Sequence, residues 1–303
     1  MIAKSLRDKF HPLYRLRQYT LARAVLTRLD FAVWVRMPRV NWKVRVRMIS
    51  HAAYYVRGAH PEIEIAALLL AIGELFAPRS FWDVGANIGY YGWLLKSSDP
   101  GLEVVMWEPD LANAHLIGAT MRRSSLSDVF LRTVAVSDTV GIRQLVVDRQ
   151  TGATSTLEGI ETSFGLTHWG IVGDLVPVTT VTIDSARSEP IDVIKIDVEG
   201  HEENVLRGAG RTLRSDQPIL VVECFHGGAC LSRTLDRLGY LLLDAERMDE
   251  DLTRGCNFLA LPPSHRSALE PLRTRRDALM ADGCPCRIIA CPSDPAVAGN
   301  RRL

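Results

Sequence analysis

Residues 81–89 read Phe-Trp-Asp-Val-Gly-Ala-Asn-Ile-Gly, and this stretch decides the fold class. An apolar run leads into Asp83, and Gly85 and Gly89 then flank Asn87 before an amphipathic segment begins. This order predicts a buried strand, a tight turn and the start of a helix. The two glycines leave room for a ligand near the backbone, because neither carries a Cβ atom.

Asp83 belongs at the carboxyl end of this strand, where open α/β sheets bind their ligands. The Asp-x-Gly-x-x-x-Gly spacing differs from the Gly-x-Gly-x-x-Gly turn that cradles a pyrophosphate. A carboxylate at this position instead suits a cationic ligand, such as an amino group beside a sulfonium. The turn therefore argues against a dinucleotide site.

A second apolar strand over residues 103–108 ends in Glu108, which Pro109 and Asp110 follow. Glu108 follows Gly89 at close to the spacing of roughly 20 residues expected for an acid that binds ribose hydroxyls. The structural alternative is that Glu108 only caps the helix starting near Asp110. Asp83 and Glu108 in one crevice would match the two polar ends of S-adenosylmethionine, and we expect this cofactor.

A third segment, Ile-Asp-Val-Ile-Lys-Ile-Asp-Val-Glu-Gly-His-Glu-Glu over residues 191–203, carries the most specific signal. Together with residues 81–89, 108–110 and 135–138, it resembles the FkbM family of S-adenosylmethionine-dependent methyltransferases over about residues 60–262. The resemblance implies a class I methyltransferase fold: a Rossmann-like, seven-stranded, doubly wound sheet whose last strand is antiparallel. It also implies O-methylation of a hydroxyl on a sugar or natural product. His201 stands where the family usually has a small or apolar residue.

The chain divides into three predicted parts: a basic accessory segment (1–60), a methyltransferase domain (61–262), and a C-terminal helix with a loose tail (263–303). Within the domain we expect a leading helix over 61–76, further helices over 110–123 and 202–214, and a strand over 129–135. Residues 141–184 predict a β insertion with a loop on the ligand side. Residues 154–157 resemble a Ser-rich element of the family, although ordinary turn chemistry explains them equally well.

The predicted site residues fall into two sets. The cofactor-binding set comprises Asp83, Gly85, Asn87, Gly89, Glu108, Asp110 and Ala135, with adenine near Ala135. The catalytic set comprises Asp197, Glu199, Glu223 and His226, which follow the fourth and fifth strands of the expected sheet.

Two mechanisms stay open from the sequence. In the first, His226 or His201 removes the acceptor proton while Asp197 orients the acceptor. In the second, Asp197 and Glu223 hold a divalent cation, for which oxygen ligands favour magnesium. We favour the first and assign no metal ligand. Asp197 and Glu199 would alternatively cap the following helix. Lys195 is expected to pair with a carboxylate such as Asp83 or Glu223.

The charge distribution marks out the first 57 residues. They hold 13 Lys and Arg against two acids, a net charge of +11, which leaves −10 for the rest of a chain of net charge +1. Leu21–Val35 is consistent with an interfacial helix, and residues 42–48 alternate apolar with basic residues as a strand does. This segment is either a layer packed on the methyltransferase core or a contact for a membrane surface or lipid carrier. No nucleic-acid module accompanies the charge.

Composition and cysteine usage bound the remaining possibilities. The chain has 303 residues, of which 47% are hydrophobic, and it shows neither an apolar run long enough to span a bilayer nor a signal core. Cys224, Cys230 and Cys256 are expected to be reduced thiols in the core, and Cys284, Cys286 and Cys291 fit no common zinc module. We therefore expect a cytoplasmic protein.

The leading hypothesis is an O-methyltransferase acting on a sugar, a lipid-linked glycan or a secondary metabolite. One alternative is a non-catalytic protein that keeps the cofactor fold and docks to an anionic membrane through its basic segment. The other is a nucleotide-dependent oxidoreductase, against which the absence of a phosphate-binding glycine turn argues.

Overall fold

A computed structural model describes residues 20–55, 62–148, 155–157 and 173–282. At its centre lies a seven-stranded sheet in the order β11-β12-β10-β9-β3-β4-β5. β12 is antiparallel to both of its neighbours, and the pairs β10–β9, β9–β3, β3–β4 and β4–β5 are parallel. The predicted doubly wound sheet with one antiparallel strand is confirmed. The strands are β3 (Ser80–Val84), β4 (Glu103–Trp107), β5 (Val129–Arg132), β9 (Val193–Ile196), β10 (Ile219–Glu223), β11 (Leu241–Asp244) and β12 (Asn257–Leu261).

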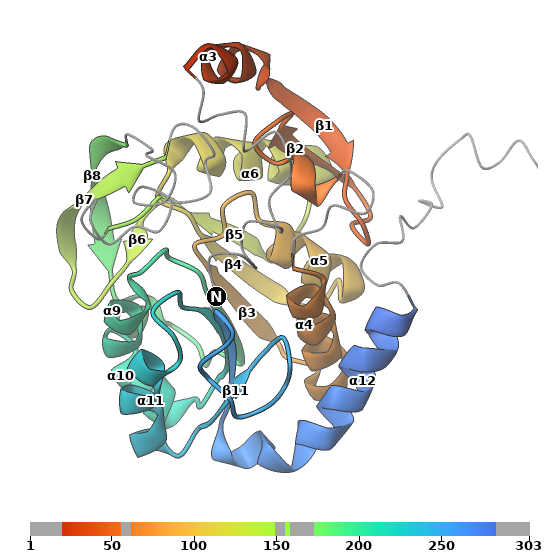
Figure 1. Cartoon of the computed structure of the whole chain (residues 1–303), viewed down its shortest axis with the longest axis vertical. Helices are drawn as coiled ribbons and strands as arrows, with labels where there is room; N and C mark the ends of the chain where they lie inside the picture. The colour runs from red at the N-terminus through yellow and green to blue at the C-terminus, as the bar shows by residue number, and fades with distance from the viewer. Residues whose placement is uncertain (1–19, 56–61, 149–154, 158–172, 283–303) are drawn as a thin grey trace, which may run out of the picture.

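Helices cover both faces of this sheet (Figure 1), as parallel strands buried on both sides require. One face carries α4 (Ile63–Phe76), α5 (Tyr90–Ser98), α6 (Leu111–Ser124) and, packed along α4, α12 (Leu269–Ala281). The other face carries α8 (Ile183–Ala186), α9 (Glu202–Arg207), α10 (Gly210–Ser215) and α11 (Ala229–Leu235). Short 3-10 helices cover Ala52–Tyr54, Asp236–Leu238 and Pro263–Ala268.

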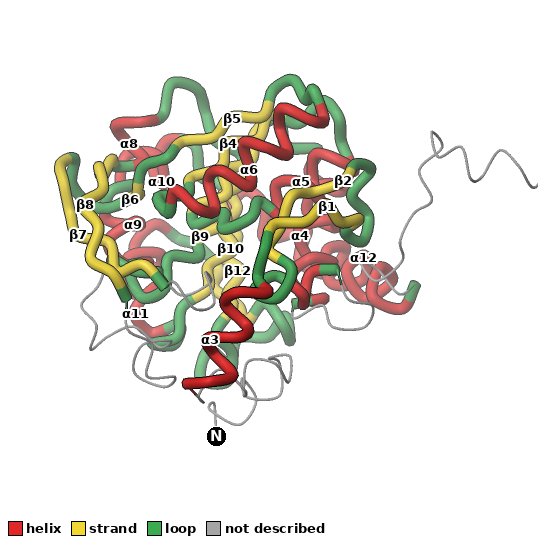
Figure 2. The backbone as a smooth tube through the Cα atoms, turned by 90° about the horizontal axis from the view of Figure 1, so that it is seen from above, coloured by secondary structure: helices red, strands yellow, loops and turns green. Residues whose placement is uncertain are grey.

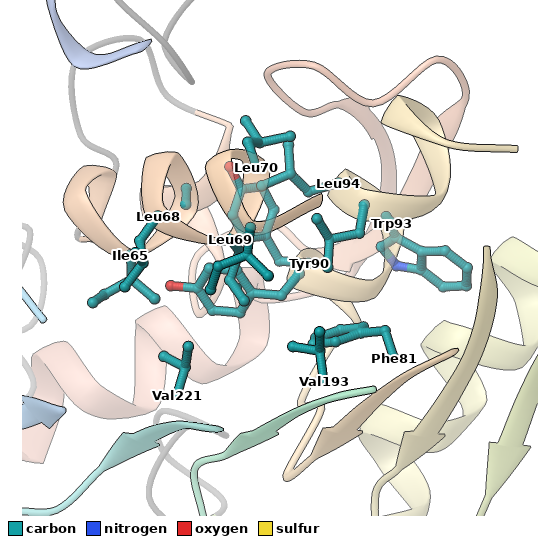
Figure 3. Packing of buried hydrophobic residues seen from close by; sticks show 14 of the residues in the cluster. Ile65, Leu68, Leu69, Leu70, Phe81, Tyr90, Trp93, Leu94, Val193 and Val221 are labelled. Carbon is teal, nitrogen blue, oxygen red and sulfur yellow. The ribbon is translucent and has the colours of Figure 1, made fainter. Parts of the chain in front are cut away.

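The core on the α4 side is the larger of the two apolar clusters. Residues 65–72 of α4 are all buried, because sheet, α5 and α12 surround that helix. Figure 3 shows Leu69 of α4 and Tyr90 of α5 reaching toward Phe81 and Val193 of the sheet. This packing fixes α5, and with it the turn that joins β3 to α5.

A second, three-stranded sheet lies beside the main one (Figures 1 and 2) and comprises β6 (Ala135–Val136), β8 (Asp174–Val181) and β7 (Gly141–Val147). This is the predicted β insertion. The predicted strand over 129–135 was too long, because β5 ends at Arg132 and Ala135 pairs instead with Thr180 of β8.

The predicted helix over 202–214 is broken into α9 and α10. At the break, a Cβ atom on Gly208 would lie 2.1 Å from the carbonyl oxygen of Ser137, so the backbones touch there. The Gly208 carbonyl accepts a hydrogen bond from the backbone N–H of Asp184 at 3.0 Å. Contact with the insertion therefore interrupts the helix.

The basic segment contributes a helix and a hairpin. α3 (Thr20–Leu29) ends earlier than the helix expected over Leu21–Val35, because β1 (Ala32–Arg36) pairs antiparallel with β2 (Lys43–Arg47). The β-branched residues in β1 favour a strand. Val44 and Val46 of β2 are completely buried in the same cluster as α4 and α5, whereas Lys43 is exposed. The hairpin is thus a layer packed on the core.

Within the described ranges, every helix is too short or too polar to cross a bilayer. The predicted loose tail and the cluster of Cys284, Cys286 and Cys291 lie outside the described residues. So do most of the loop expected over the ligand side, except for Ser155, Thr156 and Leu157.

Candidate active site

A cavity that is partly open to solvent lies at the carboxyl ends of β3, β4 and β9, where open α/β sheets bind their ligands. The three strand ends, the insertion and the loop before α9 all contribute to its wall. Its lining residues are Val84, Gly85, Asn87, Trp107, Glu108, Pro109, Asn113, Val134, Ala135, Val136, Leu145, Ser155, Leu157, Asp197, Val198, Glu199 and His201.

The turn after β3 is held between β4 and β9. The backbone N–H groups of Gly85 and Ala86 both donate to the Trp107 carbonyl, at 2.9 and 3.0 Å. Gly85 has a φ of +83°, and a Cβ atom there would lie 1.7 Å from the Asp197 carbonyl oxygen. Gly85 lines the cavity, and Gly89 does not; a Cβ on Gly89 would instead meet Met106 and Trp93. Contacts within the protein alone therefore explain why both positions are glycine.

Glu108 fixes the loop that carries it and faces the cavity. Its carboxylate accepts from the backbone N–H of Asn87 at 2.7 Å and of Asp110 at 2.8 Å. Burial raises the pKa of Glu108 to about 8. The cap of α6 is Asp110, whose side chain accepts from the Ala112 N–H at 2.9 Å, and Asp110 is not a cavity-lining residue. Glu108 is thus bound to the turn before the helix rather than capping the helix itself.

Asp83 lies in register with Lys195 on the neighbouring strand and is not among the cavity-lining residues. It is buried, and burial raises its pKa to about 6. One carboxylate oxygen accepts from the Gly92 N–H at 3.2 Å, which ties β3 to α5. The structure therefore places Asp83 beneath the turn rather than on the cavity wall.

Lys195 is a buried cation whose ammonium lies 2.8 Å from Oδ2 of Asp197. The expected pairing of Lys195 with a carboxylate is confirmed, but the hydrogen-bonded partner is Asp197 rather than Asp83 or Glu223. Burial alone would lower the pKa of Lys195, but the carboxylates of Asp197 and Asp83 raise it above its ordinary value. The ammonium also lies over the Tyr91 ring, 4.8 Å from the ring centroid.

Asp197 and Glu199 both line the cavity. The Asp197 side chain is 24% exposed, and Lys195 holds one of its oxygens. Glu199 has a φ of +54°, and its Oε2 atom is buried with no hydrogen-bond partner among the described residues. Burial, reinforced by neighbouring Asp197 and Glu202, raises the pKa of Glu199 well above its ordinary value. Neither side chain supplies a cap hydrogen bond to α9, whose N-cap is His201.

Glu223 and Glu62 are electrostatic neighbours of this pair. Burial raises the pKa of Glu223, and Asp197 and Glu62 raise it further. Glu62 accepts a hydrogen bond from the Tyr91 hydroxyl. Nothing in the sequence marks Glu62 as a site residue, because it precedes α4 and lies far along the chain from Asp197 and Glu223. The one local signal was the position of this acidic residue directly before the buried helix α4.

The two histidines fill different places. His226 is exposed in the turn after β10 and does not line the cavity. His201 lines the cavity and is buried, with Nδ1 2.7 Å from the Asn204 amide nitrogen and Nε2 2.9 Å from Ser137 Oγ. An amide nitrogen only donates, so Nδ1 accepts and Nε2 carries the proton. In this arrangement neither histidine has a free nitrogen aimed at a substrate in the cavity.

The cavity offers polar atoms to a ligand that carries both donors and acceptors. Besides Glu199 Oε2, the buried Nε1 of Trp107 and Oδ1 of Asn87 have no hydrogen-bond partner among the described residues. Both residues line the cavity. Unsatisfied buried polar atoms are costly, so a bound molecule with ribose and amine groups fits this wall.

Residues 155–157 of the Ser-rich element reach the same cavity. Ser155 and Leu157 line it, and the Thr156 hydroxyl donates to the Glu199 carbonyl at 2.8 Å. The element therefore positions the Glu199 loop as well as closing the cavity. Across the described ranges, no group of three or more His, Cys, Asp or Glu side chains is arranged to hold a metal ion.

The sheet order, with its single antiparallel strand and its cavity at the parallel strand ends, defines a class I methyltransferase fold. The sequence matches the family described as "Methyltransferase FkbM domain" over residues 83–242, more than half of the chain. The chain therefore belongs to the FkbM methyltransferase family, whose cofactor is S-adenosylmethionine.

Solved structures similar to this chain carry methyltransferase names. One is methyltransferase FkbM from Methylobacillus flagellatus, at 19% identity and a TM-score of 0.42, where the match covers 60% of this chain and 43% of that chain. Another is an O-methyltransferase from Bacillus cereus in complex with SAH, at 14% identity and a TM-score of 0.38, covering 70% and 86%. A third is the bifunctional kinase-methyltransferase WbdD, at 13% identity and a TM-score of 0.39, covering 70% and 41%. No curated protein matches the chain.

Proposed function

We propose that this methyltransferase transfers a methyl group to a hydroxyl of a sugar, a lipid-linked glycan or a secondary metabolite. The observation that carries the proposal is the pair Asp197 and Glu199 on the cavity wall, one held by Lys195 and the other with a free, buried oxygen. A carboxylate with a raised pKa is a stronger base than an ordinary one, and a hydroxyl acceptor must lose its proton.

The cofactor end of the cavity is assigned to the β3 and β4 loops. Glu108 would accept hydrogen bonds from the ribose hydroxyls, and the turn containing Gly85 and Asn87 would hold the amino acid part. Ala135, at the insertion, would border the adenine, and Trp107 Nε1 supplies a donor between them. Asp83, Gly89 and Asp110 would serve indirectly, since each supports the loops from outside the cavity wall.

In the proposed reaction, the bound cofactor supplies a methyl group that is already activated for displacement. Glu199 takes the acceptor proton at Oε2, and Asp197 orients the acceptor through the oxygen that Lys195 leaves free. Negative charge on Asp197 keeps the base strong, and Glu223 belongs to the same electrostatic cluster, because Asp197 and Glu199 both raise its pKa. Alignment of the acceptor in a site shielded from water contributes the rest. His226 has no role in this scheme, because it is exposed outside the cavity.

Assistance by a divalent cation is the competing arrangement. Asp197 and Glu223 are electrostatic neighbours, as that arrangement requires, but Asp197 already has the Lys195 ammonium as its counter-charge. Measuring methyl transfer before and after chelation, and after adding magnesium back, distinguishes the two arrangements.

The test is identification of the methylated product. Purified protein and cofactor labelled in the methyl group are incubated with fractionated cell extract, and the labelled product is analysed by mass spectrometry. A methyl ether on a small molecule or glycan supports the proposal, and a labelled protein or nucleic acid overturns it. With the acceptor known, Glu199→Gln should lower turnover by about 10²–10⁴-fold, the usual contribution of a general base. Its affinity for the cofactor should stay within a few-fold of the parent's.

A contact with an anionic membrane surface or lipid carrier is proposed for α3 and its exit turn. Val25, Leu29 and Phe31 are 49, 48 and 55% exposed, and Arg28 lies among them. Such a mixture suits an interface of lipid and water. Phe31→Ser should reduce co-sedimentation with vesicles containing phosphatidylglycerol, whereas Ile142→Ser, at an exposed apolar position on β7, should not.

The two alternatives make different predictions. A non-catalytic protein would bind S-adenosylmethionine yet yield no labelled product with any fraction. An oxidoreductase would bind NAD, and calorimetry with both cofactors separates that case.

A further inference from the structure

Two cysteines near the carboxyl end of β10 are placed for bond formation. Cys224 directly follows Glu223, and Cys230 is the second residue of α11. Their Sγ atoms lie 3.0 Å apart, and both approach the Gly227 carbonyl oxygen, Cys230 at 3.0 Å and Cys224 at 3.6 Å. A disulfide is about 2.05 Å long, so the sulfurs need to approach by only about 1 Å.

The turn between them already has the required shape. Gly227 has a φ of +82°, and its N–H donates to the Cys224 carbonyl at 3.2 Å, which folds the chain back on itself. Cys224 is 1% exposed and Cys230 is half-buried, so only Cys230 meets solvent to any extent. The pair thus has one accessible thiol and one sheltered thiol beside it.

We propose that Cys224 and Cys230 form a reversible dithiol–disulfide site that reacts with a hydroperoxide. This goes beyond methyl transfer, since neither cysteine lines the cavity. The site does not depend on the identity of the acceptor.

The surroundings decide which thiol reacts first and with what. The contact between the two sulfur atoms lowers the pKa of Cys230 and raises the pKa of Cys224. Of the two thiols, Cys230 therefore ionises more readily, and the thiolate is the reactive form. Glu202 and Glu203 place negative charge near the pair, so a small neutral oxidant reaches it more readily than an anionic disulfide such as oxidised glutathione.

The reaction balances in two steps. The Cys230 thiolate attacks one peroxide oxygen, an S–O bond forms, the O–O bond breaks, and the departing hydroxide takes a proton to become water. Cys230 is then a sulfenic acid. Cys224 loses its proton and attacks the Cys230 sulfur, so that the S–S bond forms and the S–O bond breaks. The second hydroxide leaves as water. In total, two thiols are oxidised and one peroxide is reduced to two waters.

The test uses the full-length native protein. It is treated with hydrogen peroxide, quenched with catalase, alkylated with N-ethylmaleimide under denaturing conditions and digested with trypsin. Both cysteines fall in the tryptic peptide 215–233, and Cys256 falls in 255–266. We expect peptide 215–233 to lose both alkyl groups and to be two hydrogen masses lighter than the dithiol form. A reductant added before alkylation should restore both alkylation sites.

Variants keep the proposal falsifiable. Cys224→Ser should leave a sulfenic acid on Cys230 that dimedone labels, whereas Cys230→Ser should give no such label on Cys224. Cys256→Ser should still form the disulfide. Three results would each overturn the proposal: a doubly alkylated 215–233 after peroxide, a sulfonic acid on Cys230 beside a free Cys224 thiol, or a disulfide from Cys230 to a cysteine outside this peptide.

Discussion

A Cβ atom on Gly85 would lie 1.7 Å from the carbonyl oxygen of Asp197, so the turn after β3 and the loop after β9 touch through their backbones. The Asp197 N–H also donates to the Val84 carbonyl at 2.9 Å. Two motifs more than 100 residues apart in the sequence are therefore one rigid unit. The turn that we propose to bind the cofactor is therefore in direct contact with a residue that we propose to bind the acceptor.

Gly85→Ala should accordingly be strongly destabilising. The variant adds a clash with backbone to the strain of a positive φ, which alone costs about 1–3 kcal/mol. We expect the free energy of unfolding, measured with urea, to fall by more than about 3 kcal/mol. Gly141→Ala is the control, because a Cβ there meets no atom within 4 Å, and it should change stability by less than about 1 kcal/mol. Equal effects of both variants would show that the contact is not tight.

Glu108→Gln should weaken cofactor binding. The neutral amide loses charge-assisted hydrogen bonds, worth about 1.5–3 kcal/mol, so affinity for S-adenosylhomocysteine should fall about 10- to 100-fold. Glu103→Gln, at the other end of β4, is the matched control and should leave affinity unchanged. Isothermal titration calorimetry measures both. Retained affinity in Glu108→Gln would remove Glu108 from the cofactor site.

Cofactor binding should also release a proton near neutral pH. In the protein without cofactor, burial raises the pKa of Glu108 to about 8. In the complex, ribose hydroxyls that donate hydrogen bonds to the carboxylate would lower this pKa. Affinity for S-adenosylhomocysteine should therefore rise as the pH increases toward about 8 and level off above that value. Titrations at pH 7 in buffers of different ionisation enthalpy count the protons released. Glu108→Gln should abolish the release, and an unchanged count in that variant would assign the proton elsewhere.

Lys195→Met should destabilise the protein, and more so at high pH. Without the ammonium, Asp83, Asp197 and Glu223 lose their shared counter-charge, and losing one partner of a buried pair costs about 3–5 kcal/mol. At pH 5 the raised pKa of Asp83, about 6 even beside Lys195, lets it stay protonated and neutral. At pH 8 a carboxyl such as Asp83 is ionised in the unfolded chain. In the folded variant it must either carry an uncompensated buried charge or keep its proton, so the free energy of unfolding falls as the pH rises.

Urea unfolding of parent, Lys195→Met and Lys195→Arg at pH 5 and pH 8 measures this effect. The arginine variant keeps the charge and should lose less than the methionine variant at pH 8. A loss of equal size at both pH values would point to packing rather than charge.

The elements that sequence analysis located correctly are those with a strong local pattern. The strand ending at Asp83, the strand ending at Glu108 and the strand before Asp197 are apolar runs closed by an acid, and the structure brings their ends to one cavity. Parallel strands of one sheet share an edge, so the fold class alone brings these residues together.

The details that failed depend on contacts distant in sequence. Gly208 interrupts a helix only because Ser137 touches its backbone, and Ala135 pairs with β8 rather than with β4. Similarly, Glu62 meets Tyr91 through the packing of α4 on α5. Contacts between residues so far apart in the chain leave no periodic pattern in the local sequence. The exposure of His226 depends on the direction of the turn after β10, and the residues of that turn do not indicate this direction.

Burial of Val44 and Val46 on the core-facing side of the β1–β2 hairpin affects how the protein can be produced. The backbone N–H of Arg45 donates a hydrogen bond to the Thr120 hydroxyl at 2.9 Å, so the hairpin is hydrogen-bonded to α6 as well as packed against it. An expression fragment begun at residue 61 would present an apolar strip on its surface, and such fragments tend to aggregate. An N-terminal truncation for crystallisation should therefore keep the hairpin and remove only residues that precede it.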